Sequence, residues 1–95
     1  MKVKNINGNG DVACNCASWL EHWMRFSGQP LTYYCPVVGC LHRPELGAHV
    51  QLDRSGDSAW YVIPLCRLHA EEPGGTLDVG DLIRLVPADP KVTCG

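Results

Sequence analysis

A chain of 95 residues and 10.4 kDa is long enough for one compact domain and leaves little room for a second. No apolar run approaches the roughly 18 residues that a membrane-spanning helix requires, so we expect no membrane partner. The formal net charge is -2, and the eight Lys and Arg residues are scattered, which does not favour broad binding to nucleic acid. The six Cys and four His residues are therefore the most informative about function.

The cysteines indicate metal binding more strongly than disulfide bonding. Residues 1–11 are rich in Asn and Gly and lack the apolar stretch of a secretory signal, so we expect a cytoplasmic protein. In a reducing compartment, clustered cysteines are more often metal ligands than disulfides. Disulfide pairing remains the alternative, because the cysteine count is even.

The N-terminal quarter of the chain contains one clear helix signal. Residues 1–13 hold few β-formers among Asn-Gly pairs and predict a loose arm or a short edge strand. Ser18 and Glu21 then have capping-box spacing, and apolar residues recur at helical intervals until Gly28 and Pro30. An amphipathic helix over about 18–27 is predicted, with its two Trp residues in the core.

The middle of the chain predicts a β-hairpin followed by a short helix. Residues 47–53 alternate in polarity, residues 54–58 form a turn, and residues 59–64 return as a second strand. The first strand places Ala48, Val50 and Leu52 on one face and His49, Gln51 and Asp53 on the other. One or two helical turns follow from residue 66 and end at Pro73, and two short strands around Gly80 are expected within about 76–86.

Two close ligand pairs predict a zinc site. Cys35 and Cys40 flank a tight turn in which Gly39 can take a positive φ, and Cys66 and His69 stand at the start of the predicted helix. Three thiolates and one imidazole suit tetrahedral zinc, because each pair can supply two corners. The site would carry about one negative charge, so we expect backbone amides or an arginine such as Arg67 to compensate it.

In this order, a Cys loop, a hairpin and a ligand-bearing helix resemble the treble-clef fold of the HNH endonuclease superfamily, over about residues 33–72. Cys35 and Cys40 resemble its first zinc pair, 47–50 its histidine strand, and 64–69 its strand-to-helix joint. The resemblance implies that His49 would activate water for attack on a phosphodiester. Two family features are missing, since the hairpin has no Asn and Ala70 occupies the usual place of the catalytic metal ligand.

The remaining cysteines suggest a second zinc site. Its candidate ligands are Cys14, Cys16, His22 and Cys94. The alternatives are ordinary buried thiols, a Cys14–Cys94 disulfide, or a redox pair formed by Cys14 and Cys16 near the helix N-terminus.

The sequence as a whole predicts a single α+β domain over 1–95, built on a zinc-stabilised treble clef of the HNH-like ββα type with an N-terminal amphipathic helix. We expect a non-catalytic module with one structural Zn²⁺ that binds a protein, or more weakly a nucleic acid, through the face bearing His49, Gln51 and Asp53. The alternative is an HNH-like metal-dependent nuclease in which His49 is catalytic.

Overall fold

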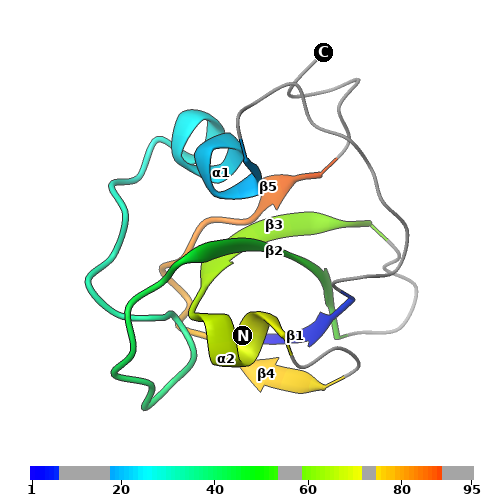
Figure 1. Ribbon diagram of the computed structural model, residues 1–95. Helices are drawn as coiled ribbons and strands as arrows, with labels where there is room; N and C mark the ends of the chain where they lie inside the picture. Colours follow the sequence, from blue (N-terminus) through cyan, green and yellow to red (C-terminus); the bar gives the residue numbers. More distant parts are fainter. Residues whose placement is uncertain (7–17, 54–58, 72–74, 89–95) are drawn as a thin grey trace.

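The computed structural model describes residues 1–6, 18–53, 59–71 and 75–88. They form a mixed α+β structure with an antiparallel sheet of strand order β4-β1-β2-β3-β5 (Figure 1). The elements are β1 (Lys2–Asn5), α1 (Trp19–Ser27), β2 (Leu46–Leu52), β3 (Tyr61–Leu65), α2 (Arg67–Ala70), β4 (Thr76–Asp78) and β5 (Val86–Pro87). Within these described ranges, no helix has the length and apolar character needed to cross a membrane.

The β2–β3 hairpin and α1 lie close to their predicted positions. In the hairpin, Ala48 pairs with Ile63 and His49 with Val62. Helix α1 begins at the N-cap Ser18, whose hydroxyl accepts a hydrogen bond from the Glu21 backbone N–H at 3.1 Å. It ends at Gly28, which adopts the left-handed conformation with φ 69°.

Strand β1 corrects the expectation of a loose arm or an edge strand. It pairs with β2 on one side, where Asn5 faces Val50, and with β4 on the other, so it lies inside the sheet. Val3 and Asn5 are fully buried. Local composition could not reveal this position, because both partner strands lie at least forty residues further along the chain.

The two helices cover opposite faces of the sheet. Helix α1 lies against the face that carries Gly47 and His49, because the Trp19 ring is 4.5 Å from the His49 ring. Asn5, on the same face as Val50, hydrogen bonds to α2, which places α2 on the other side. The hydrophobic core therefore extends over both faces of the sheet. Trp23, Ile63 and Leu65 are among its largest fully buried side chains.

The prediction of an open polar face on β2 is wrong at His49. The His49 side chain is 6% exposed, and its ring lies between Trp19 and Trp60, whose centroid is 5.9 Å away. Further along the same face, Gln51 is half-buried and Asp53 is exposed. The residues of β2 alternate between the two faces as predicted, but α1 docks over the His49 end of the strand and shields His49 from solvent.

A glycine makes this docking possible. The backbone of α1 crosses β2 at Gly47, where an added Cβ would lie 2.6 Å from the carbonyl oxygen of Trp19 and closer still to its carbonyl carbon. No side chain fits in that space without moving the helix or the strand.

We therefore expect Gly47→Ala to lower the free energy of unfolding by about 2–4 kcal/mol, because the clash involves backbone atoms that cannot rotate away. Gly80→Ala is the matched control. Its Cβ would meet only the Pro36 carbonyl oxygen at 4.0 Å, so a change below about 1 kcal/mol is expected. Urea unfolding of both variants measures the difference, and equal losses would refute the close-approach explanation.

Candidate metal centre

The 35–40 loop is held in a fixed shape by backbone hydrogen bonds. The Cys40 N–H donates to the Val37 carbonyl at 3.0 Å, and Gly39 has φ 82°, as its place in the turn predicts. The Cys35 N–H donates to the His42 carbonyl at 2.8 Å. These contacts fix the backbone of the loop that carries both thiols.

The same loop is attached to the edge of the sheet. Val37 forms an isolated β-bridge with Val79, and the Val38 N–H donates to the Asp78 carbonyl at 2.8 Å. The Gly80 N–H donates to the Pro36 carbonyl at 2.9 Å. The loop is thus attached to the end of β4 and to the two residues that follow it.

Helix α2 supplies the other two ligands from a single turn. Cys66 is its N-cap residue, and the Ala70 N–H donates to the Cys66 carbonyl at 2.9 Å. His69 follows three positions after Cys66, so both side chains project from the same side of the turn. Because β3 ends at Leu65, the hairpin delivers these ligands directly from the core.

The structure brings the four predicted ligands together. One donor atom from each of Cys35, Cys40, Cys66 and His69 lies within 4.8 Å of all the others. The Cys40 and Cys66 Sγ atoms are 3.9 Å apart, and His69 Nδ1 lies 3.7 Å from Cys35 Sγ and 3.2 Å from Cys66 Sγ. Tetrahedral zinc would place two sulfurs about 3.8 Å apart and a nitrogen about 3.6 Å from each sulfur.

This cluster can hold a metal ion, and its cysteines are not disulfide-bonded. All three are free thiols, and the 3.9 Å between Cys40 and Cys66 is far beyond an S–S bond of about 2.05 Å. Cys35 and Cys66 are buried, whereas Cys40 and His69 are half-buried. The site therefore has a closed side against the core and a partly open side.

Burial disfavours the charged thiolate form of Cys35, and a bound cation would stabilise that form. Desolvation raises the pKa of the Cys35 thiol to about 12, even though backbone N–H groups of Cys66 and Val37 act in the opposite direction. These two amides are the compensating donors expected from the sequence. Arg67 is not part of that compensation in its observed contacts, since it pairs with Glu45 at 3.2 Å and Glu71 at 3.4 Å.

The second predicted site is described at only one residue. Cys14, Cys16 and Cys94 lie outside the described residues. His22 is fully buried on α1, and its Nε2 is 3.0 Å from the Pro87 carbonyl oxygen, to which it donates as a ring N–H. His22 thus joins α1 to β5.

A hollow of about 440 Å³ opens beside the cluster. Cys40 and His69 line it, together with the apolar side chains of Val38, Leu41 and Leu68. The three apolar side chains are 66%, 76% and 56% exposed, so the open side of the cluster faces a solvent-exposed apolar surface.

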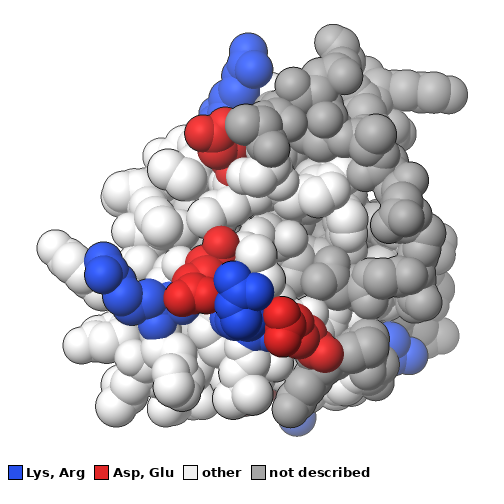
Figure 2. All heavy atoms as spheres, in the orientation of Figure 1, with Lys and Arg blue, Asp and Glu red and all other residues white. Residues whose placement is uncertain are grey.

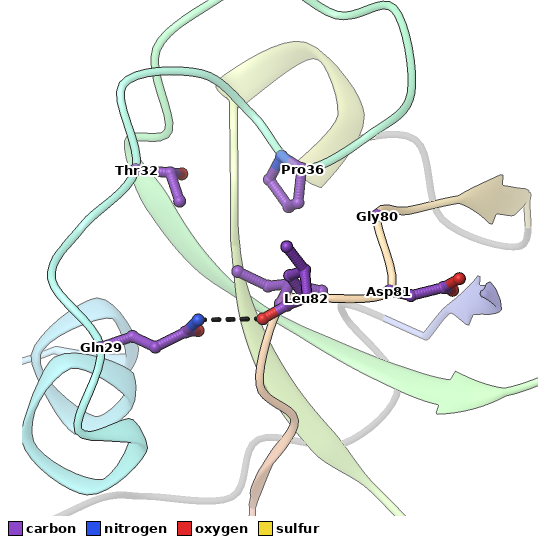
Figure 3. Close-up of a pocket in the computed structure, with 7 residues that line it drawn as sticks. Gln29, Thr32, Pro36, Gly80, Asp81 and Leu82 are labelled. Carbon is purple, nitrogen blue, oxygen red and sulfur yellow. Dashed lines mark hydrogen bonds between the residues drawn. The ribbon is translucent and has the colours of Figure 1, made fainter.

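A second hollow, of about 330 Å³, lies between the segment after α1 and residues 80–83 (Figure 3). The Gln29 amide spans one side of it, donating from Nε2 to the Leu82 carbonyl at 2.9 Å and accepting from the Arg84 N–H at 3.0 Å. Asp81 binds the Met1 amino group at 2.7 Å. The third polar side chain of the hollow, Thr32, donates to the Tyr34 carbonyl at 2.7 Å, so all three polar side chains are engaged in contacts within the protein.

Sequence reasoning missed Asn5 as a contributor to the cluster. Its Nδ2 donates to the His69 carbonyl at 2.7 Å and to the Ala70 carbonyl at 3.3 Å. The contact crosses 64 positions of sequence, and no local spacing could have indicated it.

Comparison with models of known protein families, with curated proteins and with solved structures found no match.

We expect zinc binding to release the proton that Cys35 carries at neutral pH in the metal-free protein, because only the thiolate coordinates. The apparent zinc affinity should then fall at least about tenfold per pH unit as the pH is lowered. Calorimetric titration in buffers of different ionisation enthalpy measures the protons released. Zinc affinity that is independent of pH would contradict this account of the site.

Proposed function

We propose that this protein is a zinc-binding module in which the ion is structural. The observation that carries the proposal is the convergence of three sulfurs and one nitrogen from the 35–40 loop and α2 within 4.8 Å. Thiolate and imidazole are the donors that zinc takes in structural sites. Four protein ligands also fill a tetrahedral shell and leave no position for a reactive water, which favours a structural ion over a catalytic one.

The order of elements supports a treble-clef architecture. A two-thiol loop, the β2–β3 hairpin and the ligand-bearing α2 follow one another as in the HNH superfamily. We extend this resemblance to the fold around the zinc. The resemblance does not include strands β1, β4 and β5, which extend the hairpin into a larger sheet.

A nuclease role has weaker support. A general base must reach both water and the phosphodiester. The His49 ring lies under Trp19 with its side chain 6% exposed, which restricts such access. The HNH-like nuclease alternative stays a prediction.

We further propose that the module binds a protein through the apolar surface formed by Val38, Leu41 and Leu68. These side chains line one hollow and are exposed together, which is typical of interaction surfaces. The charged residues over α2 form a short band of both signs beside a wider uncharged area (Figure 2). Arg67 is paired with Glu45 and Glu71, so this side offers little attraction to phosphate and favours an apolar protein segment.

Cys66→Ser should remove the bound zinc and much of the structure around α2, because a structural zinc contributes on the order of 10 kcal/mol. Native mass spectrometry and circular dichroism measure both effects. Cys40→His is the matched control, since it keeps a donor at the half-buried corner and should retain zinc.

Two outcomes would overturn parts of this proposal. Wild-type protein that contains no zinc and keeps its fold in EDTA would overturn the structural zinc. Magnesium-dependent nicking of plasmid DNA that His49→Ala abolishes while the fold persists would overturn the non-catalytic role and support the nuclease alternative, in which the zinc can still be structural.

The protein-binding surface is tested with a photo-crosslinking residue placed at Leu41. We expect one defined protein adduct in cells, reduced at least about tenfold by Leu68→Asp, because a charge within the surface opposes apolar contact. The same residue at Leu82, which is 89% exposed but lines the other hollow, is the control. Equal adducts from both positions, or none from Leu41, would refute the assignment of this surface.

A further inference from the structure

Asn5 is a buried polar side chain directed at the metal centre from a distant strand. It lies at the end of β1 opposite Val50 and is fully buried. Its backbone is fixed as well, since the Asn5 N–H donates to the Gly75 carbonyl at 2.9 Å and the next residue, Ile6, donates to the His49 carbonyl at 3.0 Å. The side chain therefore projects from a rigid support.

Both hydrogens of the Asn5 amide group have acceptors at the end of α2. Nδ2 is 2.7 Å from the carbonyl oxygen of His69 and 3.3 Å from that of Ala70. The His69 carbonyl also accepts from the backbone N–H of the C-cap residue Glu71, so the Asn5 amide is a second donor there. Asn5 thus adds a contact from a distant strand to the end of α2, at the candidate ligand residue itself.

Helix α2 needs such support more than an ordinary helix does. It has four residues, which is too short for a helix to persist by its own hydrogen bonds. It nevertheless carries two metal ligands, and the orientation of the His69 ring depends on where the His69 backbone lies. The Asn5 contact at the His69 carbonyl holds that backbone from a strand outside the helix.

We infer that Asn5 is a positioning residue for the zinc ligand His69, and that through this contact β1 sets the metal affinity of the site. This inference rests on the proposed structural zinc. The amide acts on the ligand's backbone and does not touch the ion, which is the role of an outer-shell partner in metal sites. Through this contact, β1 would affect metal binding although it supplies none of the four ligands.

Asn5→Asp tests the inference. It keeps the size of the side chain but replaces the two N–H donors with a carboxyl group, which donates no hydrogen as a carboxylate and only one as a neutral acid. We expect zinc affinity to fall about 10- to 100-fold, the usual effect of losing an outer-shell partner. The d–d absorption of the cobalt(II)-substituted protein should also change, because it reports the ligand geometry.

Val3→Ala is the matched control, since Val3 is also fully buried on β1 and its backbone pairs with the same two strands. This variant should lose stability while its zinc affinity stays within about threefold of wild type and its cobalt spectrum stays unchanged. If Asn5 only stabilised the fold, the two variants would show the same zinc affinity and the same cobalt spectrum whenever they lost the same stability.

The outcomes separate this inference from the proposed function. Wild-type protein that binds zinc, together with Asn5→Asp protein of equal affinity and identical cobalt spectrum, would overturn the role of Asn5 alone. Wild-type protein that binds no zinc would overturn both proposals. Weakened binding and a changed spectrum in Asn5→Asp, with neither change in Val3→Ala, would support the positioning role.

Discussion

The arrangement of the 35–40 loop and α2 depends on one constraint: their two pairs of candidate metal ligands must meet at one point. The 35–40 loop and α2 are both too short to hold a fixed position by themselves, and the hairpin separates them along the chain. Their four donor atoms nevertheless lie within 4.8 Å. Protein contacts contribute to this placement, through the Val37–Val79 bridge for the loop and the Asn5 side-chain amide for the helix.

The buried side of the centre explains why a cation suits it. Cys35 and Cys66 sit in the same core cluster as Ile63 and Leu65, where a lone thiolate is poorly solvated. Backbone amides from Cys66 and Val37 offset part of that cost at Cys35. A dication coordinated by all three sulfurs would offset the rest, so the chemistry of the ligands and their burial point to the same kind of occupant.

Short-range signals in the sequence predicted most of what is local. The two pairs of clustered residues are predictable because each pair has a short spacing, and α1 is predictable because Ser18, Glu21 and Gly28 mark its ends. Long-range packing was not accessible in the same way. The burial of His49 depends on α1 crossing β2 at Gly47, and Asn5 reaches His69 only because β1 enters the sheet beside β2. Neither spacing nor composition encodes which distant strands pair.

The place of β1 in the sheet also governs the sequence of events in folding. The hairpin joins neighbouring strands and can form early, whereas β1 must close loops of more than forty residues to reach both β2 and β4. During synthesis β4 emerges after β1, β2 and the four clustered residues, so β1 can pair with β2 before its other edge is covered. Assembly of this small sheet is thus a late, non-local step, and an open strand edge in the nascent chain is the exposure that a cell would have to manage.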